Sequence, residues 1–319
     1  MKGIPRSPSG RIATNHLADP DGDNPTELRS TFDSALSERW EEFERQTERA
    51  RSNPTEKAVH DLRVAMRRLI ALLDMIDNFL PNSEALDIRK QLKSLLDSLS
   101  ALRDTQVQIL EVQQLAARFG VLSPFLGELI TRESIQSKRA RKEIHRINIE
   151  PMKRQFDILR SKISDVLVDP SMEDVAMSIL HGLLSQVFFR MNSLRKEVAR
   201  ASNDSKEKCE IVHRLRLLFK RFRYTIEILK PTLPGVSDRL LKRMREFQLK
   251  MGTIQDTEVL LASVSTEARK ARKKEIKRGN TPPDQFGPVV QLMTGRLDED
   301  LRVFLATLGE LDTYWKRVK

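Results

Sequence analysis

Two short stretches of the sequence repeat the same charged residues at the same spacing. Residues 59–69 read VHDLRVAMRRL, and residues 212–222 read VHRLRLLFKRF. On a helix, which turns by about 100° per residue, His60, Arg63 and Arg67 share one side because they lie three and four residues apart. Histidine and arginine donate hydrogen bonds to phosphate and carboxylate oxygens. The first stretch therefore predicts a helix face that binds anions.

The second stretch carries the same stripe on the side opposite its apolar residues. His213, Arg216 and Lys220 repeat the spacing of the first stripe. Neither stripe meets a carboxylate before Asp74 or Glu227, whereas an exposed surface normally mixes charges of both signs. A solvated outer face is the alternative interpretation. We favour an anion with repeated charges. The residues that flank the two stripes are Arg68, Arg221, Arg223 and Tyr224.

A third group of cations lies between residues 124 and 150, opposite an apolar stripe. The corresponding helix near the C-terminus is less basic, because Val303 stands where Arg139 would fall. The basic run 269–278 could supply the missing charge, although we expect it to be a mobile, solvated loop. The members of the third group are Arg132, Lys138, Arg139, Lys142 and Arg146 in the first half and Arg296 and Arg302 in the second.

One cation falls inside an apolar stripe. Arg103 lies among leucines and valines on the helix expected at 84–118, and Gln255 has the equivalent place later in the chain. A buried polar group needs a partner. We expect a structural hydrogen bond or an ion pair, to Asp104 or Asp256, and favour this over contact with a ligand.

The elements that position these residues are predicted to be helices only. The chain is rich in leucine and poor in aromatic residues (5%), and it shows helical periodicity without strand signals. Residues 1–25 are rich in Pro, Gly, Asp and Asn, which predicts a disordered leader. Prolines divide the rest into helices expected at 26–51, 55–79, 84–118, 124–165, 172–202, 206–230, 236–277 and 285–317.

The two halves of the chain resemble each other. His213 follows His60 by 153 residues, and the sequence QDTEV at 255–259 follows RDTQV at 103–107 by 152 residues. Two matches in the same order at nearly the same offset indicate a duplication. We therefore expect two antiparallel four-helix repeats, at 26–168 and 169–319, which together form one domain.

Composition narrows the class of partner and the kind of site. The net charge of +11 favours a polyanion, such as nucleic acid, an anionic membrane surface or a phosphate polymer. The single cysteine, Cys209, excludes an intrachain disulfide and a cysteine-based zinc site. No apolar run is long enough to cross a membrane, and the N-terminus lacks the apolar stretch of a signal peptide. We expect a cytoplasmic protein.

The doubled histidine stretch and the RD/QD element about forty residues after it resemble the CHAD family (conserved histidine α-helical domain). The similarity covers roughly residues 26–317. It implies two pseudo-symmetric four-helix bundles around a basic central cavity or pore. It also implies binding of inorganic polyphosphate and, in bacteria, association with polyphosphate granules. The residues that match the family's His-x-x-Arg pattern are His60, Arg63, Arg67 and Arg68, and His213, Arg216, Lys220 and Arg221.

Three alternatives stay open beside polyphosphate binding. Nucleic-acid binding is the main one, although single-strand binders usually place aromatic side chains in a basic groove and only Tyr224 lies beside a cationic stripe. A phosphohistidine or phosphohydrolase enzyme is less favoured, because no P-loop is present and no carboxylate is placed to orient either histidine. A metal site has no suitable ligand spacing. We predict no cofactor and make no prediction of the oligomeric state.

Overall fold

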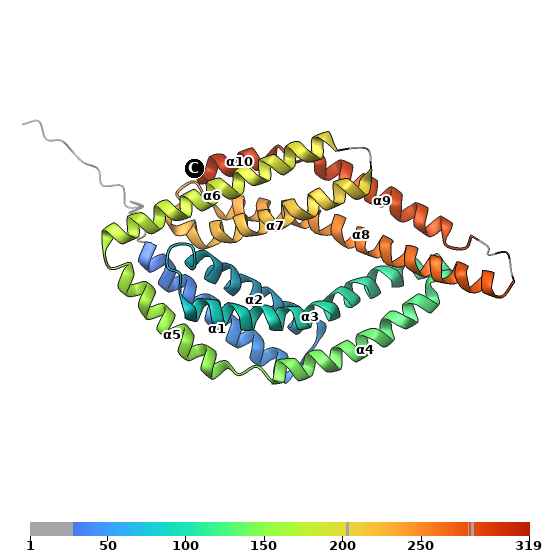
Figure 1. Cartoon of the computed structure of the whole chain (residues 1–319), viewed down its shortest axis with the longest axis horizontal. Helices are drawn as coiled ribbons and strands as arrows, with labels where there is room; N and C mark the ends of the chain where they lie inside the picture. Colours follow the sequence, from blue (N-terminus) through green and yellow to red (C-terminus); the bar gives the residue numbers. More distant parts are fainter. Residues whose placement is uncertain (1–27, 202–203, 280, 282–283) are drawn as a thin grey trace, which may run out of the picture.

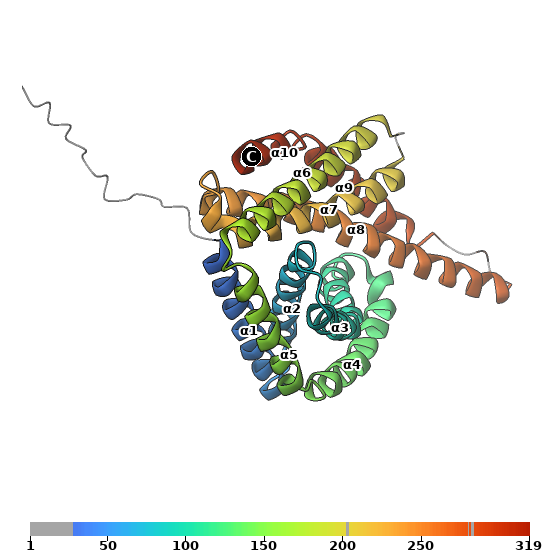
Figure 2. The same cartoon turned by 60° about the vertical axis from the view of Figure 1, so that its left-hand side comes forward.

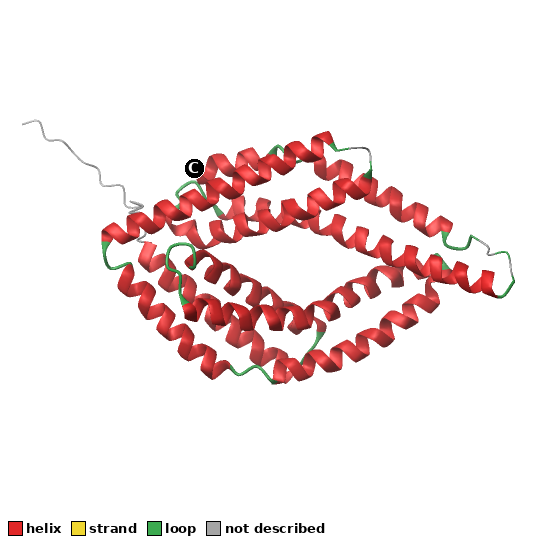
Figure 3. Cartoon of the chain, in the orientation of Figure 1, coloured by secondary structure: helices red, strands yellow, loops and turns green. Residues whose placement is uncertain are grey.

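A computed structural model describes residues 28–201, 204–279, 281 and 284–319. The predicted leader at 1–25 lies outside this part of the chain. The described residues form α-helices, two short 3-10 helices and loops, with no strand, so the predicted all-α class is confirmed (Figure 3). The α-helices are α1 Leu28–Ser52, α2 Glu56–Ile76, α3 Ser83–Ala116, α4 Ser123–His145, α5 Ile149–Val166, α6 Pro170–Arg200, α7 Ser205–Leu229, α8 Asp238–Lys277, α9 Gly287–Leu305 and α10 Glu310–Val318; the 3-10 helices are η1 Gly120–Leu122 and η2 Lys230–Thr232.

Two of the expected helices are each divided into a pair. The helix expected at 124–165 breaks between α4 and α5, where Pro151 stands in the first turn of the new helix. Proline is tolerated there because the first backbone N–H groups of a helix have no partner within it. The helix expected at 285–317 breaks at Ala306–Gly309 between α9 and α10. Each half of the described chain therefore contains five α-helices rather than four.

The basic run 269–278 is helical, and the expectation of a loop there was wrong. α8 continues to Lys277, and Arg278 caps it. Ion pairs within one turn of helix, Lys270 with Glu267 and Arg278 with Glu275, support its last turns.

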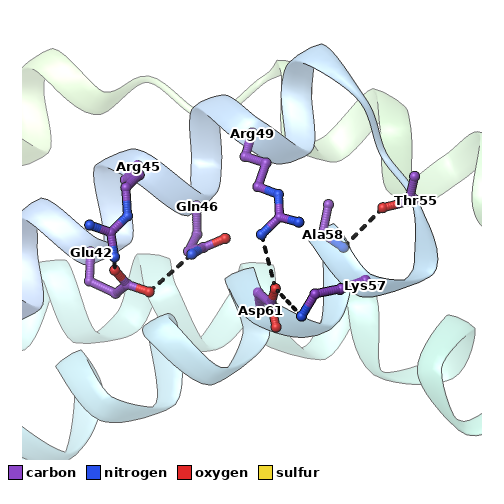
Figure 4. A network of polar contacts seen from close by, with 8 residues as sticks. All are labelled: Glu42, Arg45, Gln46, Arg49, Thr55, Lys57, Ala58 and Asp61. Atoms are coloured by element: carbon purple, nitrogen blue, oxygen red, sulfur yellow. Dashed lines mark hydrogen bonds and ion pairs between the residues drawn. The ribbon is translucent and has the colours of Figure 1, made fainter.

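Polar side chains fix the junction between α1 and α2 (Figure 4). Thr55 caps α2, because its hydroxyl accepts a hydrogen bond from the backbone N–H of Ala58 at 3.2 Å. Arg49 of α1 and Lys57 of α2 both pair with Asp61, at 3.2 and 3.3 Å. Helix α2 thus begins at a defined residue, and the carboxylate next to His60 is already neutralised.

The helices of the first half lie on one side of the molecule and those of the second half on the other (Figures 1 and 2). Within each half α1 packs on α2 and α2 on α3, while α6 packs on α7 and α7 on α8. The halves meet where α2 and α1 contact α7, and again where the ends of α3 and α4 reach α8 and α9. The neighbours in each half occur in the same order, although the duplication itself stays a prediction.

Buried apolar side chains form two clusters. The main core draws residues from both halves, so the halves share one core instead of burying separate ones. The second cluster, here called the distal cluster, joins the far ends of α3 and α4 to α8 and α9. Its buried members are Val112, Leu122, Phe125, Leu129, Leu260, Val264, Val289 and Met293.

The distal cluster should unfold separately from the main core, because the two clusters share no buried residue. Leu129 is fully buried, and its replacement by alanine (Leu129→Ala) removes about 2–4 kcal/mol of stability. We expect amide hydrogen exchange to rise in α4, α9 and the adjoining ends of α3 and α8, while α2 and α7 keep their protection.

Ile135→Ala is the matched control, since Ile135 lies on the same helix and is half exposed. Faster exchange of equal size in every helix of the Leu129→Ala variant would show that the distal cluster is not a separate unit.

Candidate functional site

The packing of α2 against α7 brings cations from the two halves to one cavity. The cavity measures about 450 Å³ and is lined by α2, α3, α6 and α7. Figure 1 shows α2 below α7, with α3 next to α2 and α6 next to α7. Five of the lining residues are cationic: Arg67 from α2, Lys93 from α3, and Arg216, Lys220 and Arg221 from α7.

The cations at the centre of the cavity are close enough to oppose one another's charge. Burial is the main cause that lowers the pKa of Lys220 to about 7, and the nearby charges of Arg216 and Arg67 lower it further. Burial also lowers the pKa of Arg216, where Arg67 adds to the effect and Asp256 opposes it. Arg67 of the first half therefore acts on two cations of the second.

The five cations form no ion pair with any side chain in the described part of the protein. The one carboxylate that lines the cavity, Asp74, is paired with Arg89 at 2.7 Å. The Nε atom of Arg216 is buried and has no hydrogen-bond partner among the described residues. The cavity thus holds positive charge that its own side chains do not neutralise.

Arg63 belongs to the predicted stripe but does not line the cavity. Its side chain is only 3% exposed and donates hydrogen bonds to the carbonyl of Leu96 at 3.0 Å and to Ser100 Oγ at 3.1 Å. Burial lowers the pKa of Arg63 to about 10, and the charge of Arg67 adds to the shift. This arginine links α2 to α3 and sits behind the cavity cations.

Arg223 is also turned into the protein and does not line the cavity. It is 4% exposed, its Nε donates to Gln248 at 2.9 Å, and its guanidinium pairs with Glu227 one helical turn on. The guanidinium also lies over the ring of Tyr224, 4.4 Å from the ring centre. A carboxylate four residues later and an acceptor on α8 explain why this cation points away from its neighbours in the stripe.

The structure places both histidines outside the lining of the cavity. His60 is exposed, and its pKa is lowered by partial burial and by the charge of Arg103. His213 donates its Nδ1–H to the side-chain oxygen of Gln255. Glu258 accepts a hydrogen bond from the same glutamine at 3.1 Å; burial raises the pKa of this carboxyl group, and the nearby His213 opposes the shift. The histidines lie beside the cavity cations, not among them.

Arg103 makes an ion pair, as expected, but with a different partner. Its guanidinium contacts Glu56 at the start of α2 at 2.6 Å, so the predicted partners Asp104 and Asp256 were wrong. Gln255, at the equivalent position, bonds His213 instead. Arg103 thus joins α3 to the first residue of α2, and Gln255 joins α8 to α7 at His213.

Sequence reasoning missed two cations near the site. Lys93 lines the cavity from α3, three residues before the apolar Leu96 that lines it too; this spacing on one helix face is the signal that could have identified it. Arg39 of α1 is half-buried, and its pKa is lowered by burial and by the charge of the half-buried Arg68. No pattern in α1 points to Arg39, because its neighbour is 29 residues away in the chain.

The remaining predicted cations are exposed on α4, at its C-cap Arg146, and on α9. None of them lines the cavity. Several are paired locally: Arg146 with Glu143 at 3.0 Å, and Arg302 with Glu299 at 2.6 Å. Arg296 reaches Glu111 of α3 at 3.0 Å. The exposed cations without an ion pair to a described residue are Arg132, Lys138, Arg139 and Lys142.

No group of three or more His, Cys, Asp or Glu side chains in the described ranges is arranged to hold a metal ion. None of the described helices combines the length and the apolar character needed to span a bilayer.

Comparison with known proteins identifies the family. The CHAD domain model matches residues 34–265. Two solved structures share the fold: the CHAD domain from the plant Ricinus communis, with a TM-score of 0.59, 18% identity and coverage of 92% of this chain and 93% of that one, and PptA from Streptomyces chartreusis, with a TM-score of 0.50, 18% identity and coverage of 91% and 100%. A search of curated protein sequences finds no match. The family model spans more than half of the chain, and the chain therefore belongs to the CHAD family.

Proposed function

We propose that this protein binds inorganic polyphosphate in the cavity between α2 and α7 and catalyses no reaction on it. The observation that carries the proposal is the meeting of Arg67 with Arg216 and Lys220, cations from the two halves of the chain that oppose one another's charge and form no ion pair within the described residues. A guest with several negative charges would relieve this repulsion.

Polyphosphate matches the chemistry of these residues. It is a linear chain with about one negative charge per phosphate and no bases for a protein to read. Arginine offers a fork for two phosphate oxygens, and lysine offers a point charge. The exposed cations of α4, which include Arg132, Lys138, Arg139 and Lys142, would contact a long chain that extends beyond the cavity. The family resemblance supports the same ligand and, with it, an association with polyphosphate granules.

Catalysis is disfavoured by the surroundings of the two histidines. The side chain that orients His213 is the amide of Gln255. Beside His60, the carboxylate of Asp61 is already held by Arg49 and Lys57 (Figure 4). A general base needs an acceptor that orients it and stabilises its protonated form. We propose that both histidines support the site without acting as acids or bases.

Charge reversal at the cavity should abolish tight binding. In the double variant Arg67→Glu and Arg216→Glu, one cation of each half becomes an anion. We expect the Kd for long-chain polyphosphate to rise at least about 100-fold, which corresponds to roughly 3 kcal/mol. For the unmodified protein, neutralisation at five cations predicts a plot of log K against log salt with a slope of about −3.5. Titration calorimetry at several salt concentrations measures both quantities.

The matched control reverses two exposed cations of α6 that do not line the cavity, Lys196→Glu and Arg200→Glu, and changes the net charge by the same amount. We expect its Kd to change by less than about fivefold, because screening weakens exposed charges. Circular dichroism checks that both double variants stay helical. Equal losses in the two variants would mean that overall charge, not the cavity, governs binding, and normal binding by the cavity variant would end the proposal.

Binding should take up a proton at Lys220. Because its pKa is about 7 in the empty protein, this lysine is mostly neutral at pH 8. A bound polyanion favours the charged form and raises the pKa, so the site gains close to one proton at pH 8 and affinity falls about tenfold from pH 7 to 8.5. Calorimetry in two buffers with different ionisation enthalpies measures the uptake directly.

Lys220→Arg is the control for this prediction, because arginine keeps its charge throughout this pH range. The variant should bind polyphosphate with little proton uptake at pH 8. Uptake of the same size in both proteins would place the titrating group elsewhere, and the absence of uptake in the unmodified protein would show that Lys220 is charged before the polymer arrives.

Polyphosphate should displace single-stranded DNA at equal phosphate concentration. Single-strand binders stack bases on aromatic side chains, whereas Tyr224 is the one aromatic residue that lines the described cavity, and Arg223 already lies over its ring. Competition followed by the fluorescence anisotropy of labelled oligothymidine tests the order of affinities. Displacement that requires a large excess of polyphosphate would favour the nucleic-acid alternative.

A further inference from the structure

The cavity between α2 and α7 has an apolar wall that polyphosphate does not use. Its aliphatic members come from four helices: Ile70 and Met75 from α2, Leu96 from α3, Leu183 from α6 and Leu217 from α7. Polyphosphate offers oxygen atoms and charge but no carbon. Ile70, Met75 and Leu183 also belong to the main core, so Leu217 is the apolar side chain of this lining that neither the core nor the proposed ligand accounts for.

Leu217 shows most clearly that this wall is not simply part of the core. It lies directly after Arg216 and three residues before Lys220, within the cationic stripe of α7, and is 52% exposed. The core-facing residues of the same helix, Leu215 and Phe219, are fully buried on the other side. Leu217 is thus exposed to water beside three cations, and its packing gives no structural reason for a leucine at this position.

Cavities that combine aliphatic walls with a few charged groups at one side are typical of sites for small organic ligands, and a volume of about 450 Å³ lies within their usual range. The single aromatic side chain in the lining, Tyr224, is already covered by Arg223, so no free ring is offered to a nucleotide base. The polar lining beyond the cations is confined to Asp74, which is paired with Arg89, and Thr225. The wall therefore suits an alkyl or alkenyl chain better than a base.

We propose that the cavity also binds small phosphate amphiphiles, molecules with a phosphate or diphosphate head and an aliphatic chain of about ten carbons. The head would contact Arg67, Arg216 and Lys220, and the chain would lie against Leu217 and the aliphatic residues around it. The placement of the head rests on the proposed function, since the same cations serve both ligands. The contribution of the chain is independent of it.

The test compares geranyl diphosphate with inorganic pyrophosphate by titration calorimetry, at concentrations below those at which the amphiphile self-associates. Both probes carry a diphosphate head, and only the first carries a chain. We expect geranyl diphosphate to bind about 30-fold more tightly. Its binding should also show a negative heat-capacity change that pyrophosphate lacks, because apolar surface is removed from water. Equal affinities, or no binding of either probe, would overturn the inference.

A pair of variants locates the chain. Leu217→Gln should bring the ratio of the two affinities close to one, and using pyrophosphate as the reference within the same variant separates loss of the chain contact from damage to the head site. Leu249→Gln is the matched control, because Leu249 is 68% exposed on α8 and does not line the cavity. It should keep the 30-fold ratio. A ratio unaffected by Leu217→Gln would place the chain elsewhere and refute the proposal.

The outcome for polyphosphate is read separately. If the protein does not bind long-chain polyphosphate but binds geranyl diphosphate more tightly than pyrophosphate, the proposed function is refuted and this inference stands. If it binds polyphosphate but binds the two small probes with equal affinity, the proposed function stands and this inference is refuted.

Discussion

The repulsion among Arg67, Arg216 and Lys220 is the constraint to which the rest of this structure responds. Burial lowers the pKa of Arg216 and of Lys220, and the charge of Arg67 lowers both further. Such an arrangement costs folding free energy, which the extensive apolar core shared by both halves must offset. Side chains left in an unfavourable state within a well-packed protein are frequent at sites where function, not stability, sets the sequence.

The protein separates its structural cations from its free ones. Arg63 bonds the carbonyl of Leu96 and the hydroxyl of Ser100, Arg103 pairs with Glu56, and Arg223 bonds Gln248 of α8 and pairs with Glu227. They fasten α2 to α3 and α7 to α8, and so hold the helices that carry Arg67 and Arg216. The duplicated motif therefore contains two kinds of arginine, one that builds the site and one that faces the cavity.

Helical periodicity predicted the all-α class and the boundaries of most helices, because the signal is local. It also placed Arg67, Arg216 and Lys220 on one face each. It could not separate Arg63 from Arg67, since a helical wheel gives the direction of a side chain and not its neighbour; the carbonyl of Leu96 that binds Arg63 belongs to another helix. Lys93 and Arg39 were missed for the same reason. The breaks between α4 and α5 and between α9 and α10 lie beside Pro151 and Gly309, residues that disfavour a helix interior but are tolerated at its first turn or its cap, so the sequence alone did not decide between a continuous and a divided helix.

The distal cluster has a mechanical consequence for the width of the cavity. α3, with 34 residues, and α8, with 40, each run without a break from the main core to the distal cluster, and both clusters hold them. Each helix is held at one end by the main core and at the other by the distal cluster. The spacing between the two halves is therefore fixed at two distant points. Substitution of Val112, Leu260 or Val264 would thus let α3 and α8 move apart. It would weaken the proposed binding of an anion from a distance, without changing a residue of the cavity.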